Sequence, residues 1–401
     1  MNAWAAARRI LCVRLDSLGD VLMCTPAMRA LRLSGFADSP AAESETETGT
    51  ETGTGAARSI TLLCAPGGAA AVPFIPEIDA LIVHEVPWMK GSPGQPRPAD
   101  LALVETLAAS AFDAAVIFTT YTQSALPAAL LCHLAGIPLR LAHCRENPYH
   151  LLSDWIPDPE PDRTVRHEVQ RQLALVQRVG CTAVDLGLSF VPRAADHAAA
   201  EACLNEVGIH CGIERRQRFV LLHPGASAAS RRYPPGHWAE AIALLWAQTA
   251  LPLVLSGSAA DIPLVEAIRA RAGVPTLSLA GKLGLGELGA VVQRAAVAVT
   301  NNSGPAHIAA AVGTPLVDLY ALTNPQHTPW GVRSRVLFHD VPCRFCFKSV
   351  CPQGHHDCLA GVAPARVAAA VLDLLDGGAP AAPPVLADAA EQTAADGLST
   401  S

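Results

Sequence analysis

The segment Arg9–Leu15 reads RILCVRL, and the turn DSLG at Asp16–Gly19 and the segment Asp20–Leu33 follow it directly. Its nearly unbroken apolar run predicts a buried strand. In Asp20–Leu33, apolar residues recur at helical spacing, at Val21, Leu22, Met28 and Leu31. A strand, a short glycine-containing turn and a helix in this order favour an open parallel α/β sheet.

Strands and helices alternate along the rest of the chain. Short apolar runs predict strands at Ile60–Cys64, Ala80–Val83, Ala114–Phe118, Leu139–Ala142, Phe219–Leu222, Leu253–Ser256, Val297–Thr300 and Leu316–Tyr320. Helices are predicted at Val165–Gly180, Gly236–Gln248, Ile262–Arg271, Leu288–Ala295, Pro305–Val312 and Pro364–Leu375. This alternation is typical of βαβ units and predicts a parallel sheet in each half of the chain.

The length of the chain suggests two domains. We expect them at residues 1–190 and 191–362, divided at the extended segment Gly187–Ala194, with a last helix at 363–376. Two further segments have little to bury. Residues 37–57 are acidic and rich in Thr and Gly, and residues 377–401 are rich in Ala, Pro and Asp. We expect the first to be a disordered insertion and the second a disordered tail.

The composition narrows the class of protein. Half of the 401 residues are apolar and the net charge is −7, which argues against a general nucleic-acid binder. The uncharged stretches Ala114–Leu139 and Ala241–Ala260 contain prolines and polar residues, so neither is expected to span a membrane. No secretory signal is visible, and we therefore expect a cytoplasmic protein with few disulfides.

The first segment that could carry chemistry is RLDSLGD, from Arg14 to Asp20. Gly19 permits a tight turn, and Asp20 falls at the start of the predicted helix. Asp20 is either a helix cap that accepts a backbone N–H or a base that accepts a proton from a substrate hydroxyl.

The second segment combines HPGAS at His223–Ser227 with the arginine pair Arg231 and Arg232. Backbone N–H groups in a loop of small residues, beside two arginines, suit a diphosphate. The alternative is a solvated basic turn whose aromatic residues, Tyr233 and Trp238, pack at the edge of the core.

The third segment is TNNSGPAH, from Thr300 to His307. Ser303 suits the helix cap, Gly304 leaves room for a ligand, and Pro305 fits the first helical turn. The start of such a helix is a ready phosphate site. The alternative is an ordinary capped helix in which His307 is a core residue.

Together, the stretches Gly19–Arg32, His223–Glu240, Leu279–Leu288 and Val299–Tyr320 resemble glycosyltransferase family 9, the ADP-heptose:lipopolysaccharide heptosyltransferases. The resemblance covers roughly residues 9–375. It implies a GT-B architecture, in which two Rossmann-like domains face each other across a cleft. The acceptor binds on the N-terminal side and the ADP-sugar on the C-terminal side, and the last helix packs back towards the N-terminal domain.

The resemblance also implies roles for particular residues. Asp20 matches the catalytic base, with Arg14 and Gly19 on the acceptor side. The donor-binding positions are Ser227, Arg231, Asp261, Lys282, Leu283, Asn302, Ser303, Gly304 and His307. Among these, Asp261 is a candidate for the ribose hydroxyls, and Lys282 and Leu283 are expected beside the adenine. Asn302 departs from the family, which more often has Asp there.

The function implied is inverting transfer of a heptose from ADP-heptose to the lipopolysaccharide inner core, with lipid A–Kdo or a core heptose as acceptor. No cofactor is expected, and the sequence has no Asp-x-Asp metal motif. The lipid acceptor implies peripheral contact with the inner membrane surface. The alternatives are a non-enzymatic ADP-sugar-binding relative, suggested by Asn302, and transfer of a different sugar. A Rossmann dehydrogenase is disfavoured, because no G-x-G-x-x-G follows the first strand.

A cysteine cluster precedes the last helix, with the pattern C-x2-C-x4-C-x6-C at Cys343, Cys346, Cys351 and Cys358. Four thiolates can hold a structural zinc ion tetrahedrally. The other interpretation is a set of reduced structural cysteines or an occasional disulfide. A catalytic role is not expected, because glycosyl transfer needs no thiol.

Overall fold

The computed structural model describes residues 3–34, 58–90, 92, 94–210 and 217–378. The expected insertion at 37–57 and all but the first two residues of the tail at 377–401 lie outside the described residues. The chain divides into two compact units between Leu186 and Gly187, close to the predicted boundary. Each unit is described by itself.

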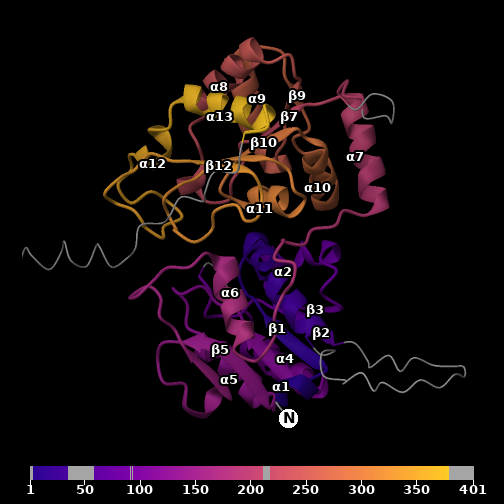
Figure 1. The fold of residues 1–401 in the computed structure, drawn as a ribbon, viewed down its shortest axis with the longest axis vertical. Coiled ribbons are helices and arrows are strands. Elements are labelled where there is room, and N and C mark those ends of the chain that lie inside the picture. The colour runs from indigo at the N-terminus through magenta and orange to yellow at the C-terminus, as the bar shows by residue number, and fades with distance from the viewer. Residues whose placement is uncertain (1–2, 35–57, 91, 93, 211–216, 379–401) are drawn as a thin grey trace, which may run out of the picture. The chain divides into compact units, whose positions relative to one another are not determined.

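The first unit is built on a parallel six-stranded sheet (Figure 1). Its strands are β1 (Arg9–Val13), β2 (Ser59–Cys64), β3 (Ala80–Val83), β4 (Ala114–Ile117), β5 (Leu139–Cys144) and β6 (Asp154–Pro157), in the order β3-β2-β1-β4-β5-β6. Its helices are α1 (Ala3–Ala6), α2 (Leu18–Leu33), α3 (Pro66–Ala69), α4 (Arg97–Ala109), α5 (Leu126–Leu134) and α6 (Glu168–Gln177). The helices α2 and α6 pack together, whereas α4 and α5 share an apolar cluster with alternate residues of β1 and β4.

The second unit repeats this design with strands β7 (Val220–His223), β8 (Leu253–Leu255), β9 (Leu277–Ser278), β10 (Val297–Asn301), β11 (Leu316–Leu319) and β12 (Ser334–Leu337). Their order is β12-β11-β10-β7-β8-β9, and every pair is parallel. One apolar cluster joins the sheet to α8 (Pro235–Gln248), α9 (Ile262–Ala272) and α13 (Pro364–Leu375). The other joins it to α7 (Ala194–Glu206), α10 (Leu285–Arg294) and α11 (Gly304–Ala311), while the short α12 (Asp357–Ala360) precedes α13.

Both sheets therefore have the Rossmann strand order, and the fold class predicted from the sequence is confirmed. In each sheet the order reverses between two central strands, β1 and β4 in the first unit and β7 and β10 in the second. Open α/β sheets bind ligands outside the carboxyl ends of the strands at such a switch point. The segments that follow β1, β7 and β10 are the three segments that the sequence analysis singled out.

The last helix, α13, packs within the second unit. Its apolar side chains, among them Val367, Val371 and Leu374, are buried in the core of that unit, against α8 and the sheet. Its packing towards the N-terminal domain stays a prediction. No helix in the described ranges is long and apolar enough to cross a bilayer.

Candidate active site

A cluster of charged side chains lies directly after β1, where Arg14 is completely buried. Its guanidinium contacts three carboxylates. Nε lies 2.9 Å from Asp16 Oδ2, Nη2 donates to Asp20 Oδ1 at 3.1 Å, and Nη1 donates to Glu168 Oε1 at 2.6 Å. Burial lowers the pKa of Arg14, but the three carboxylates outweigh it and raise that pKa, so the guanidinium stays charged.

Asp20 is fixed through both of its carboxylate oxygens. Oδ1 accepts from Arg14, and Oδ2 accepts from the backbone N–H and the hydroxyl of Ser17 at 3.1 and 2.7 Å. The helix cap is Ser17, and Asp20 is the third residue of the helix that completes the capping box. The side chain of Asp20 is still 15% exposed at the carboxyl end of β1. Asp20 is therefore placed where a ligand at the carboxyl ends of the strands could reach it, in addition to its part in the capping box.

Asp16 is a second carboxylate at the same place, and the sequence analysis passed over it. Its Oδ1 accepts from Gln123 Nε2 at 2.6 Å, and Gln123 belongs to the loop after β4. Burial raises the pKa of Asp16 to about 6, the charges of Asp20 and Glu168 add to the rise, and Arg14 and Gln123 oppose it. The loops on both sides of the switch point therefore meet at this carboxylate.

Glu168 reaches Arg14 from α6 and is itself completely buried. Its Oε1 also accepts from Gln172 Nε2 at 2.7 Å, one helical turn further on. The same helix is anchored by Arg171, which makes a bidentate contact with Asp158 at 2.7 and 2.8 Å and also contacts Glu160. The sequence placed a helix here but gave no sign that Glu168 would pair with Arg14.

In the second unit, Arg231 connects the loop after β7 with the loop after β10. Its Nη1 donates to the main-chain carbonyl of Asn302 at 3.5 Å, and its Nη2 donates to Asn324 Oδ1 at 3.1 Å. The structure therefore brings Arg231 next to the start of α11, as the diphosphate hypothesis requires. Ser303 occupies the N-cap position of that helix, with its hydroxyl donating to the carbonyl of Asn301 at 3.3 Å, and Gly304 begins the helix.

Two neighbouring asparagines hold these loops in place. Asn301 accepts from the backbone N–H of Tyr233 at 3.0 Å and donates to the carbonyl of Pro224 at 2.8 Å. Asn302 accepts from the N–H of Ala321 at 3.2 Å and donates to its carbonyl at 3.5 Å. A carboxylate at position 302 could not make the second bond, because it has no donor. Asn302, where the family more often has Asp, therefore makes a backbone hydrogen bond that Asp could not make.

Asp261 lies over the ends of β7 and β8, where two glycines leave room for it. A Cβ on Gly225 would lie 2.6 Å from Asp261 Oδ2, and one on Gly257 would lie 2.9 Å from Asp261 Cβ. The same Oδ2 accepts from the backbone N–H and hydroxyl of Ser258 at 2.9 and 2.6 Å. This places Asp261 on the sheet edge beside the HPGAS loop.

The other expected donor residues are spread along the same edge. Ser227 is exposed in the HPGAS loop, and His307 is buried in α11. Lys282 and Leu283 follow the edge strand β9, where Lys282 Nζ lies 3.7 Å from Glu206 Oε2 and Leu283 packs on the core. No contact joins these two residues to Arg231 among those found in the described chain.

A carboxyl that the sequence analysis did not single out is Asp318, on β11. It is completely buried, and neither of its oxygens has a hydrogen-bond partner among the described residues. Its register partner on β10 is Thr300. Burial raises the pKa of Asp318 well above its usual range, although Arg231 opposes the rise. Burial therefore favours the protonated form of this carboxyl.

The cysteine cluster lies against the Arg231 turn. All four cysteines are free thiols and, together with Ser230, line one small hollow. Ser230 donates from its N–H to the carbonyl of Ser349 at 3.0 Å and from its hydroxyl to the carbonyl of Lys348 at 2.7 Å. Within the described residues, no three Cys, His, Asp or Glu side chains are placed to hold a metal ion. The zinc interpretation of this cluster stays a prediction.

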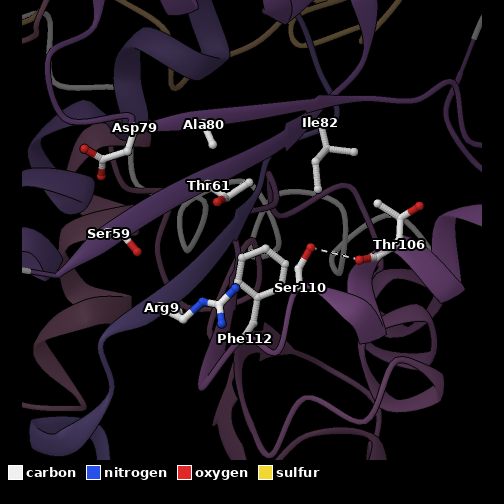
Figure 2. A pocket seen from close by; sticks show the side chains of 9 residues that line it. All are labelled: Arg9, Ser59, Thr61, Asp79, Ala80, Ile82, Thr106, Ser110 and Phe112. Atoms are coloured by element: carbon white, nitrogen blue, oxygen red, sulfur yellow. Dashed lines mark hydrogen bonds between the residues drawn. The ribbon is translucent and has the colours of Figure 1, made fainter.

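A separate pocket, with a volume of about 300 Å³, lies at the amino ends of the strands of the first sheet (Figure 2). Arg9 and Ser59 line it at the first residues of β1 and β2, and Phe112 lies just before β4. The residues around Asp20 follow the carboxyl ends of the strands instead. This pocket is therefore not part of the candidate site.

Two Rossmann-like units with charged and phosphate-suited loops at their switch points define a GT-B glycosyltransferase. The family model for glycosyltransferase family 9 (heptosyltransferase) matches residues 101–356. The chain belongs to this family.

Similar proteins agree with this assignment. Lipopolysaccharide heptosyltransferase 2 of Escherichia coli is 29% identical over 256 residues, which cover 60% of this chain and 70% of that protein. Lipooligosaccharide heptosyltransferase 2 of Haemophilus influenzae is 40% identical over 113 residues, which span 26% of this chain and only 32% of that protein. The solved structure of E. coli ADP-heptose lps heptosyltransferase II aligns with a TM-score of 0.65 at 22% identity, over 92% of this chain and 99% of that one.

Proposed function

We propose that this protein is an inverting glycosyltransferase that moves a heptose from ADP-heptose onto the lipopolysaccharide inner core. The acceptor would be lipid A–Kdo or a core heptose. The names of the relatives support this substrate class. The observation that carries the proposal is the contact of Arg231 with the carbonyl of Asn302, because it puts a cation beside the N-terminus of α11. A diphosphate is the ligand that this pairing suits.

On the donor side, the leaving ADP gains negative charge as the bond to the sugar breaks. Arg231 and the backbone N–H groups at Ser303 and Gly304 would meet that charge. We propose that the reaction therefore needs no divalent cation. Asp261 and the turn at Lys282 and Leu283 would bind the nucleoside further along the same sheet edge.

On the acceptor side, Asp20 would accept the proton of the attacking hydroxyl. The hydroxyl oxygen forms a bond to the anomeric carbon from the face opposite ADP, and the carbon–oxygen bond to the diphosphate breaks with its electron pair leaving on ADP. Configuration at the anomeric carbon is thereby inverted. Arg14 holds Asp20 in place for this step.

The acceptor proposed here is a lipid-linked saccharide. We therefore propose that the protein works in the cytoplasm and contacts the inner leaflet of the inner membrane peripherally, through its acceptor. No nucleic acid is among its proposed partners.

The test is ADP release by the purified protein from ADP-heptose, with and without lipid A–Kdo acceptor. We expect acceptor-dependent release that persists in excess EDTA. Release that stops in EDTA would contradict metal independence alone. Tight ADP-heptose binding with no release on any inner-core acceptor would contradict the enzyme and favour an ADP-sugar-binding protein.

A further inference from the structure

The guanidinium of Arg14 is shared among more carboxylates than it can neutralise. Asp16, Asp20 and Glu168 all contact it, at Nε, Nη2 and Nη1 respectively. Arg14 and Glu168 are fully buried, whereas Asp16 and Asp20 each keep 15% of the side chain exposed. The two partly exposed carboxylates therefore lie on one cation at the edge that a substrate could reach.

This arrangement bears on how basic Asp20 is. A carboxylate that accepts from an arginine, a backbone N–H and a hydroxyl is stabilised in its ionised form. Such a carboxylate alone would be a poor proton acceptor, because a good general base needs a pKa closer to the working pH. A further carboxylate on the same guanidinium counteracts this stabilisation, since the positive charge is divided between them.

We propose that Asp16 is a positioning residue for the proposed glycosyl transfer, which acts through the shared guanidinium of Arg14 to keep Asp20 a competent proton acceptor. The inference rests on the proposed function. Asp20 remains the group that touches the acceptor hydroxyl, and Asp16 takes no proton from substrate.

The surroundings of Asp16 support this role. The charged and titratable groups that face it in the described chain are Arg14 on its own strand end, Asp20 on α2 and Glu168 on α6, while the neutral Gln123 faces it from the loop after β4. The thiol of Cys24 on α2 lies near Arg14, and burial raises its pKa well above the usual range, so it stays neutral. The negative charge of Asp20 raises the pKa of Asp16, and the effect must be reciprocal.

The first test is the pH profile of kcat/KM for heptose transfer by wild type and by Asp16→Asn. Wild type should lose rate as the pH falls through about 6, where Asp16 takes up a proton, and Asp16→Asn should lack this step. Above that pH, Asp16→Asn should be slower than wild type by about 10-fold, because Asp20 becomes a weaker base without the neighbouring charge. The affinity for ADP should not change. Asp113→Asn is the matched control, since Asp113 accepts from the N–H groups of Arg8 and Arg9 at the other end of the strand.

A merely structural role for Asp16 would lower the rate by the same factor at every pH and leave the shape of the profile unchanged, and that result would overturn the inference. If wild type transfers no heptose at all, the proposed function is contradicted. That outcome is distinct from the one that contradicts the role of Asp16.

The second test needs no activity and does not depend on the folding of Asp16→Asn. Carbon-13 spectra of aspartate-labelled wild type should show a carboxyl that titrates near pH 6. In Asp20→Asn that midpoint should fall by about one unit, because the neighbouring negative charge is gone. A midpoint that stays in place in Asp20→Asn, or no aspartate titrating above about pH 5, would show that the two carboxylates are not coupled.

Discussion

Arg14 and Glu168 are 154 residues apart in the chain, yet Nη1 of the arginine lies 2.6 Å from Oε1 of the glutamate, and both side chains are completely buried. This contact ties α6 to the loop after β1, where Asp20 lies. The last helical segment of the first unit therefore helps to hold the residue that we propose as the base.

Glu168→Gln should lower the free energy of unfolding by about 1.5–3 kcal/mol, because it removes a buried charge-assisted hydrogen bond to Arg14. Urea unfolding measures this loss. The exposed pair of Glu266 and Arg269 provides the control, and Glu266→Gln should change stability by about 0.5 kcal/mol or less. Equal losses in the two variants would mean that the buried pair of Arg14 and Glu168 stabilises the fold no more than the exposed pair of Glu266 and Arg269.

Arg231→Ala should weaken ADP binding by about 10- to 150-fold, since a hydrogen bond to a charged group contributes about 1.5–3 kcal/mol. Calorimetric titration with ADP gives the constant directly. Arg344→Ala removes an arginine that pairs with Asp340 at the surface, and it should leave the affinity unchanged. If Arg231→Ala binds ADP with wild-type affinity, the turn is only a solvated basic loop.

Asn302→Asp should destabilise the second unit by about 1–3 kcal/mol, because a carboxylate oxygen would face the carbonyl of Ala321 in a buried position. Thermal unfolding at neutral pH measures the change. Should Asn302→Asp instead be as stable as wild type and transfer heptose faster, Asn302 would be a lost functional carboxylate and not a structural adaptation.

Asp318 makes stability depend on pH. Its pKa is raised in the folded protein, so the folded state binds the proton more tightly than the unfolded chain. The stabilisation from that proton is complete below the ordinary aspartate pKa of about 4 and is lost as pH rises, at up to about 1.4 kcal/mol per unit. Asp318→Ala should remove this slope and be more stable than wild type at pH 8. The measurement is the free energy of unfolding from pH 5 to 8, with Asp340→Ala at an exposed position as the control. If Asp318 is ionised in the fold, Asp318→Ala will show the same pH slope as wild type, which contradicts the prediction.

Much of the fold could be predicted from the sequence, because central parallel strands such as β1, β4, β7 and β10 are continuous apolar runs buried on both faces. The strands β6, β9 and β12 were missed. They are sheet edges, short or only partly buried, and their residues carry no comparable pattern. The packing of α13 on α8 and the second sheet was not predicted, since an amphipathic helix does not reveal which apolar surface will cover it.

The candidate site was predictable only in part. Gly19–Asp20, Arg231 and Ser303–Gly304 lie in the segments that directly follow predicted strands, so their places at the carboxyl ends of the sheets followed from the strand pattern. The contacts of Arg14 with Glu168 and of Asp16 with Gln123 bring together residues from distant segments. The sequence alone suggests that Asn302 is a substituted functional residue, whereas the structure shows two hydrogen bonds from its side chain to the backbone of Ala321.

The measurement that tests the account most directly is the mass of a lipid A–Kdo acceptor after incubation with ADP-heptose and either wild type or Asp20→Asn. Wild type should add one heptose residue. Asp20→Asn should bind ADP normally but transfer about 100- to 10,000-fold more slowly, the usual loss when a general base is removed. An unmodified acceptor after incubation with folded, ADP-binding wild type would contradict the proposed transfer, and more than half of wild-type turnover in Asp20→Asn would contradict its role as the base.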